Sequence, residues 1–175
     1  MFLLDPIGEY AFRPATEEDE AFVRSLYSIT LRSQMPFEET NLSNDEIEAL
    51  IQYQFNAQTL HYTSNYPFAD ISIIHNDDEP VGRLIIIEFE DEVRLGDLMI
   101  LPAHQNRGIC SSIMDRYVRR GLETKRPIRL HVEKANRAVN LYRRKRFAVV
   151  EDLSSHWLME YQHEPLPGDA GPARQ

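Results

Sequence analysis

Two hydrophobic periods divide the chain into a helical first third and a strand-rich remainder. In the first third, apolar side chains recur every three or four residues, which predicts amphipathic helices over residues 17–31 and 44–62. From residue 69 onward, short runs of apolar and β-branched residues alternate with turn signals and predict strands. Residues 84–87 form an unbroken apolar run, as expected for a strand that is buried on both faces.

The order of the predicted elements is typical of an α+β fold with a mixed sheet. Strands are expected over residues 10–14, 69–75, 81–89, 95–101, 128–133, 147–151 and 156–161. Two further helices are expected, one opening at Gly108 and one over residues 136–145. The helix that opens at Gly108 connects strands 95–101 and 128–133, so these two strands should be parallel.

A single domain is predicted over residues 1–162. Residues 163–175 are rich in Pro, Gly and Ala and lack an apolar period, so a disordered C-terminal tail is expected there. The chain of 175 residues is long enough to bury a sizeable core.

The turn after strand 95–101 has the properties of an anion-binding site. It reads Gln105-Asn106-Arg107-Gly108-Ile109-Cys110. A helix that starts directly after such a turn leaves backbone N–H groups unpaired at the positive end of its dipole. Arg107 adds a cation at the same place, so a phosphate group is the expected ligand.

Charge and composition narrow the classes of function. The net charge of −9 argues against a nucleic-acid partner and is compatible with a cationic substrate such as an amine. Cys110 is the only cysteine, and neither a signal peptide nor a membrane-spanning run is recognised, so a cytoplasmic protein without a membrane partner is expected. The six His residues are scattered, and no metal site is predicted.

Two motifs resemble those of the GNAT superfamily of N-acetyltransferases. The turn is similar to the family's pyrophosphate loop, Gln/Arg-x-x-Gly-x-Gly/Ala, except that the bulkier Cys110 replaces the last small residue and predicts somewhat weaker cofactor binding. The second pattern is Asn-x-Ala-x-x-Leu-Tyr followed, after three residues, by Gly-Phe. It is matched by Asn136, Ala138, Leu141, Tyr142 and Phe147. Arg146 replaces the Gly, so it must either adopt a left-handed conformation or end the helix differently.

The resemblance covers roughly residues 8–162 and implies a fold and an activity. The implied fold is α+β, with a mixed, mostly antiparallel sheet of about seven strands, a central parallel pair that is splayed apart, and helices on both faces. The implied reaction transfers an acetyl group from acetyl-CoA to a primary amine of a small molecule or peptide by direct attack in a ternary complex. A homodimer is compatible with this interpretation. Two alternatives remain open: a non-catalytic CoA-binding regulatory module and an acidic partner-binding protein.

The resemblance also assigns the cofactor site. The pantetheine arm of acetyl-CoA is expected along the central strand, where a backbone N–H can polarise the thioester carbonyl. The diphosphate is expected at the turn, and Asn136 is expected to hydrogen-bond the pantetheine amides. The full predicted set is Leu98, Met99, Ile100, Gln105, Asn106, Arg107, Gly108, Ile109, Cys110, Ser111 and Asn136.

Acid–base roles are assigned to few residues. Tyr142 is the predicted proton donor to the departing thiolate, because the matching family Tyr points at the thioester sulfur; a packed core aromatic is the alternative. Neutralising an amine of pKa about 10.4 at pH 7 costs roughly 4–5 kcal/mol, so a proton acceptor is needed. Glu133 is preferred and Asp97 and His131 are the other candidates, although Asp97 and His131 would also suit solvent-facing or salt-bridged positions.

One face of the second predicted helix changes from apolar to polar. Gln54, Gln58 and His61 continue the line of Ile47 and Ile51. This face either lines a cavity or is a partly solvated helix end. In the resembled family the segment between the first two strands shapes the acceptor side.

Overall fold

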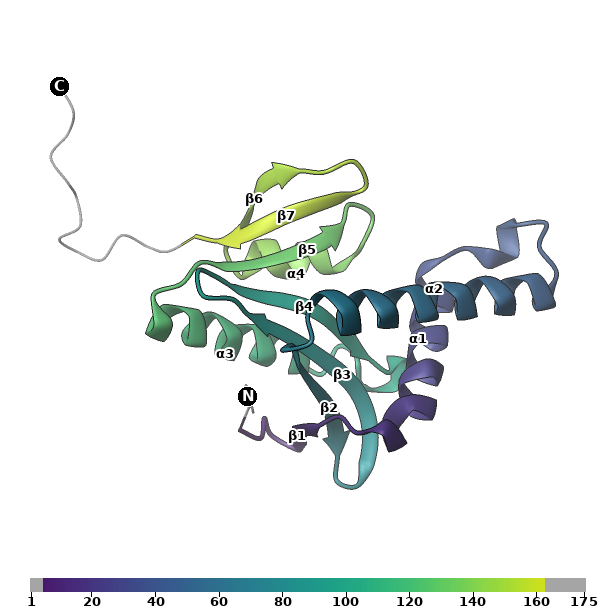
Figure 1. The fold of residues 1–175 in the computed structure, drawn as a ribbon, viewed down its shortest axis with the longest axis horizontal. Helices are drawn as coiled ribbons and strands as arrows, with labels where there is room; N and C mark the ends of the chain where they lie inside the picture. Colours follow the sequence, from purple (N-terminus) through teal and green to yellow (C-terminus); the bar gives the residue numbers. More distant parts are fainter. Residues whose placement is uncertain (1–4, 163–175) are drawn as a thin grey trace, which may run out of the picture.

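The computed structural model describes residues 5–162, and Figure 1 shows how their elements are arranged. The strands are β1 (Tyr10–Pro14), β2 (Asp70–Asn76), β3 (Glu79–Glu88), β4 (Val93–Ile100), β5 (Ile128–Glu133), β6 (Phe147–Asp152) and β7 (His156–Tyr161). The α-helices are α1 (Glu20–Gln34), α2 (Asn44–Asn65), α3 (Ile109–Thr124) and α4 (Ala138–Arg144). Short 3-10 turns are η1 (Glu17–Asp19), η2 (Phe37–Glu39) and η3 (Pro102–His104). The predicted element order is confirmed, while the tail expected over 163–175 lies outside the described residues.

The seven strands form one mixed sheet in the order β1-β2-β3-β4-β5-β7-β6. All neighbouring pairs are antiparallel except β4 and β5, which are parallel as the connecting helix predicted. Helices α3 and α4 pack on one face, where Ile113, Tyr117 and Val139 belong to the main hydrophobic core. Helix α1 contacts β3 and β4, and Tyr62 of α2 reaches β4 on the opposite face. The predicted α+β fold with helices on both faces is thus confirmed.

The parallel strands are paired at one end and separated at the other. Their register covers only Val93 with Ile128, Arg94 with Arg129, and Leu95 with Leu130. At the paired end the hydroxyl of Tyr117 lies 2.7 Å from the carbonyl oxygens of Val93 and Arg129, one on each strand. From residue 96 onward β4 has no partner on the β5 side within the described chain, so its backbone edge is open there.

A β-bulge at Gly96 marks the point of separation. The register between β3 and β4 shifts here, from Ile86 opposite Leu95 to Ile85 opposite Asp97. The carbonyl oxygen of Gly96 accepts a hydrogen bond of 2.6 Å from the hydroxyl of Tyr62. Burial raises the pKa of Tyr62, so this hydroxyl remains a donor. The bulge also turns the Asp97 side chain toward the face that carries α1 and α2, because β-strand side chains alternate between faces.

Ion pairs connect the strands at the end where β4 and β5 are still paired. Glu92 is buried and forms ion pairs with Arg94 on β4 and, at 2.7 Å, with Arg129 on β5. Arg129 also pairs with Glu160 on β7 at 2.7 Å. These four residues, called the strand clamp below, connect three neighbouring strands at the closed end of the parallel pair.

Helix α1 runs across α2, and the N-terminal part of α2 projects beyond the sheet together with the segment that joins the two helices (Figure 1). A capping box starts α2, because Ser43 and Glu46 exchange side-chain and backbone hydrogen bonds. The projecting part has a small hydrophobic cluster of its own, built on Phe37, Ile47 and Ile51 and separate from the main core. The apolar side chains that predicted these helices are therefore buried largely against one another, between the two helices.

Arg146 adopts the left-handed conformation, with φ +68°. Of the two outcomes expected where Arg146 replaces the family's glycine, a left-handed residue or a different helix end, the structure has the first. A left-handed backbone strains a residue that has a Cβ atom, and glycine relieves this strain. We expect Arg146→Gly to raise the free energy of unfolding by about 0.5–1 kcal/mol, measured by urea denaturation. Arg144→Gly, within α4, is the matched control and should lower it by about 1 kcal/mol; equal effects of the two changes would contradict the role assigned to the backbone.

Candidate active site

A cavity of about 730 Å³ opens where β4 and β5 separate. Its walls come from these two strands, from the turn before α3, from α4, and from α1 and α2 on the other face. All the predicted cofactor and catalytic residues line this cavity except Arg107. Two sequence motifs that lie about 30 residues apart are thus brought to a common space by the sheet.

The turn before α3 presents open backbone donors to the cavity. Asn106 and Gly108 have positive φ angles of 60° and 82°, and α3 begins at the next residue, Ile109. Within residues 5–162, the amide N–H groups of 106–111 have no hydrogen-bond acceptor. A Cβ atom at Gly108 would meet nothing within 4 Å, so glycine is favoured there by its φ angle and not by lack of space. Such amides at a helix N-terminus suit a phosphate group.

Gln105 fixes this turn to both neighbouring elements. Its side-chain Nε2 donates to the carbonyl oxygen of Ile100 at 2.7 Å, and its Oε1 accepts from the guanidinium of Arg137. The match of Gln105 to the loop pattern therefore has a structural reason, which is to hold the turn against the end of β4 and the start of α4.

The two arginines near the turn differ in position. Arg107 is 52% exposed, lies 3.6 Å from Glu9 and does not line the cavity. Arg137 lines the cavity and contacts Gln105. Sequence reasoning chose Arg107 and did not single out Arg137, although Arg137 stands inside the second motif.

Asn136 and Tyr142 approach the cavity from α4. The Oδ1 atom of Asn136 accepts a hydrogen bond of 2.8 Å from the N–H of Ala138, which caps α4 and leaves the side-chain NH₂ free to donate. Tyr142 packs its ring against Phe147, with centroids 6.2 Å apart, and lines the cavity. Burial raises the pKa of Tyr142, with smaller contributions from Cys110 and Asp97, so its hydroxyl carries a proton at neutral pH.

The two candidate carboxylates have different surroundings. Asp97 accepts a hydrogen bond of 2.6 Å from Arg83, whose side chain is only 6% exposed. Gln58 accepts another from the same guanidinium, also at 2.6 Å. Glu133 is 65% exposed and lies 3.8 Å from His156. Asp97 is already engaged by a guanidinium and Glu133 is not, so this geometry favours Glu133 as the proton acceptor.

His131 also lines the cavity. Burial lowers the pKa of His131, with a smaller contribution from the cation of Arg94. A neutral imidazole is a possible proton acceptor at neutral pH, so His131 stays a candidate beside Glu133.

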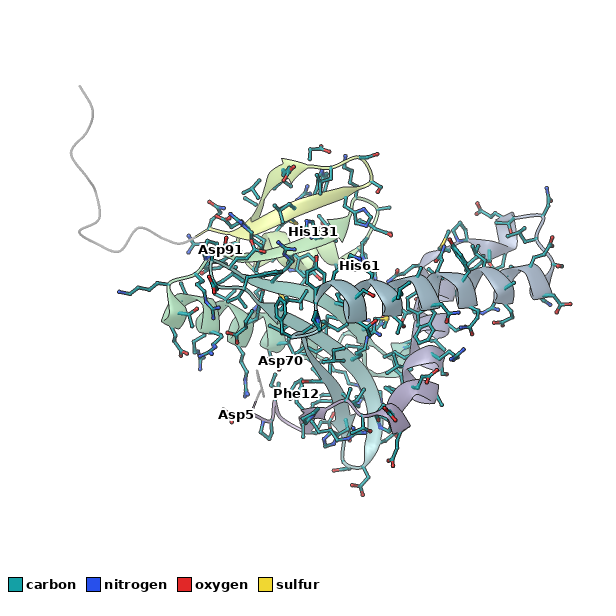
Figure 2. All side chains as sticks on the ribbon, in the orientation of Figure 1. Asp5, Phe12, His61, Asp70, Asp91 and His131 are labelled. Carbon is teal, nitrogen blue, oxygen red and sulfur yellow. The ribbon has the colours of Figure 1, made fainter. Side chains whose placement is uncertain are left out.

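The polar face predicted on α2 divides between two environments. Gln54 and Gln58 line the cavity. His61 does not; it contacts Asn65 and packs edge-on against Tyr62 and Tyr66. In Figure 2 His61 is labelled at the end of α2 that crosses the sheet, and His131 on β5. Tyr27, on α1, completes this side of the cavity.

Two further properties concern the described part of the chain only. No helix within residues 5–162 is both long and apolar enough to cross a membrane. In the same range, His, Cys, Asp and Glu side chains form no group of three that could hold a metal ion.

Comparisons with known proteins agree with this geometry. The model of the acetyltransferase (GNAT) family matches residues 23–147, which is more than half of the chain. No curated protein matches the chain.

Solved structures share the fold at low sequence identity. PaiA N-acetyltransferase from Thermoplasma acidophilum, in complex with coenzyme A, is 16% identical; the match covers 88% of this chain and 99% of that one, with a TM-score of 0.67. A variant of SpeG spermidine N-acetyltransferase from Vibrio cholerae is 18% identical over 88% and 94% of the two chains, with a TM-score of 0.57. Ard1 from Thermoplasma volcanium is 19% identical over 87% and 96%, with a TM-score of 0.56. On the strength of the family match and the shared fold, the chain belongs to the GNAT family of acetyltransferases and is an acyltransferase.

Proposed function

We propose that this acyltransferase moves an acetyl group from acetyl-CoA to a primary amine by direct attack in a ternary complex. The observation that carries the proposal is the position of Tyr142. Tyr142, whose hydroxyl burial keeps protonated, lines the same cavity as the open edge of β4 and the unpaired amides of the turn before α3. A thioester held between the edge and the turn would place its sulfur within the space that Tyr142 lines.

The donor half of the site follows from the backbone. The N–H groups of 106–111 would bind the diphosphate, together with the cation of Arg137. The open edge at Leu98, Met99 and Ile100 would pair with the pantetheine arm and polarise the thioester carbonyl. Coenzyme A in the PaiA structure, which has the same fold, supports this donor. Holding both reactants in one cavity supplies the proximity that acyl transfer requires.

The proton balance assigns separate roles to three side chains. The amine nitrogen attacks the carbonyl carbon, the C–S bond breaks, and CoA leaves as a thiolate. Tyr142 gives its proton to the thiolate, and Glu133, directly or through water, takes the proton that the amine loses. Asp97, with its charge already shared with Arg83, orients the amine by accepting a hydrogen bond.

Acetyl-CoA binding and turnover together test this function. Acetyl-CoA should raise the temperature of thermal unfolding. At a concentration 100 times Kd it should raise the free energy of unfolding by about 2.7 kcal/mol. A panel of amines should then release CoA, measured with a thiol reagent. Acetyl-CoA binding without CoA release from any amine would indicate a regulatory module instead. Absence of binding to every acyl-CoA would refute the donor assignment and favour a partner-binding protein.

The two arginines near the turn give a matched pair of variants. We expect Arg137→Met to weaken acetyl-CoA binding about tenfold, because a charge-assisted contact to phosphate is lost. Arg107→Met should change Kd by less than about twofold, since Arg107 faces Glu9 outside the cavity. Isothermal calorimetry measures both. The reverse ranking would restore Arg107 as the phosphate ligand and remove Arg137 from the site.

A further inference from the structure

The wall of the cavity that α1 and α2 form is uncharged. It consists of Tyr27, Thr30, Leu31, Gln34, Gln54 and Gln58. The charged side chains of these two helices do not line the cavity, and some of them pair with each other, as Arg24 does with Glu20 and Arg32 with Glu48. The side of the cavity opposite the donor turn therefore offers amides and hydroxyls to a ligand and no formal charge.

The strand residues that line the cavity next to this wall add little net charge. Arg83 cancels the charge of Asp97 through two contacts, at 2.6 and 3.3 Å, and is itself held by Gln58. Among the described residues that line the cavity, Glu133 is then the only carboxylate without an Arg or Lys partner. Glu133, with His156 3.8 Å away, can therefore receive one ammonium group. The cations that line the cavity, Arg137 and Arg144, lie at or in α4 on the other face of the sheet.

Several polar groups of this wall have no partner of their own. The side-chain amides of Gln34 and Gln54 make no hydrogen bond within residues 5–162. The hydroxyl of Thr30 is buried and unpaired in the same range. An unpaired buried hydroxyl costs about 1–3 kcal/mol, and Thr in a helix has two accessible χ1 rotamers between which the oxygen of Thr30 can turn. A ligand with hydrogen-bonding groups would relieve this cost.

We propose that this wall is an acceptor subsite for an amine that carries one positive charge and a neighbouring uncharged, amide-like group. A polycation would bring a second ammonium to a wall that has no anion for it. An amino acid with a free carboxylate would find no cation on the wall and would face Glu133. This inference rests on the proposed function and adds to it the chemical class of the acceptor.

The test compares acceptors of similar shape and different polarity. Alaninamide carries the amide, 3-methyl-2-butylamine replaces it by an isopropyl group, alanine carries a carboxylate, and spermidine is a polycation. The readout is kcat/KM for the amine, from CoA release at saturating acetyl-CoA. Because an amide also lowers the pKa of the neighbouring amine, the variants below, and not the comparison among amines alone, decide the role of the wall.

Two substitutions remove hydrogen-bonding groups from the wall at similar volume. Gln54→Leu and Thr30→Val should each lower kcat/KM for alaninamide about five- to tenfold, and that for 3-methyl-2-butylamine less than about twofold. The KM for acetyl-CoA should not change. Gln52→Leu and Thr59→Val, on α2 but outside the cavity, are the matched controls and should leave both amines unaffected.

A third substitution tests the charge balance. Arg83→Gln uncovers Asp97 and should raise the spermidine-to-alaninamide ratio of kcat/KM about tenfold. Asp97→Asn, which leaves Arg83 without its partner, should shift the same ratio in the opposite direction. The second variant keeps the test decisive if Arg83→Gln does not fold.

The outcomes separate this inference from the proposed function. Preference of the unaltered enzyme for spermidine or alanine over alaninamide would overturn the inference while acetyl transfer to amines stands. Equal losses with alaninamide and 3-methyl-2-butylamine in Gln54→Leu and Thr30→Val would do the same. Absence of CoA release with every amine would overturn the proposed function, and the inference with it.

Discussion

Replacing Tyr142 by Phe is expected to lower kcat for acetyl transfer by about 10²–10³-fold and to change the Kd of acetyl-CoA by less than about twofold. The ring would keep its packing against Phe147, so binding is preserved, whereas the proton for the departing thiolate is lost. Because burial raises the pKa of Tyr142, the hydroxyl should stay protonated across the range of a pH–rate profile up to its ordinary pKa of about 10. Stopped assays of CoA release and calorimetry measure the two quantities.

A surface tyrosine provides the control for this substitution. Tyr53 lies on α2 and is 73% exposed, so Tyr53→Phe should leave both kcat and Kd unchanged. If Tyr142→Phe weakens binding as much as it slows turnover, the residue supports the fold of the site and is not the proton donor. Another acid or solvent would then have to protonate the thiolate.

Replacing Glu92 by Ala is expected to lower the free energy of unfolding by about 2–3 kcal/mol. The substitution removes the centre of the strand clamp. Arg94 and Arg129, which are opposite each other in the parallel register, would then face one another without the carboxylate between them. The loss is expected below the upper end for buried pairs, because Arg129 keeps its contact with Glu160. Urea denaturation followed by circular dichroism measures it.

The turn between β3 and β4 supplies a matched control. Glu90 is exposed, and Glu90→Ala should change stability by less than about 0.5 kcal/mol. Similar losses for both variants would show that the strand clamp contributes nothing beyond the ordinary effect of a surface substitution. The double variant Glu92→Ala with Arg94→Met, compared with the two single variants, measures the coupling energy between these two residues.

Local patterns were sufficient to predict most of the architecture. Apolar periods located the helices and strands to within a few residues, and the helix between strands β4 and β5 implied that this pair is parallel. The two motifs led to the residues that line one cavity because each depends on a short stretch of chain. The missing glycine at Arg146 left two conformations open, and the structure has the left-handed one.

Features that depend on register or on side-chain direction were not predictable in the same way. The bulge at Gly96 and the pairing of Asp97 with Arg83 require the alignment of two antiparallel strands, which periodicity alone does not give. One signal was available, namely a lone Arg in the apolar strand β3 and an Asp in the following strand. Whether Arg107 or Arg137 lines the cavity depends on where each side chain points from the chain, and no pattern of residue types encodes that direction.

The separate hydrophobic cluster between α1 and α2 has an evolutionary consequence. Since Phe37, Ile47 and Ile51 pack apart from the main core, substitutions around them need not disturb the elements that surround the donor turn, whereas Gln58 and Tyr62 are bonded to the sheet. Selection acting on these two helices could therefore diversify the nitrogen compounds that are modified, while the ability to use the same activated thioester is inherited unchanged.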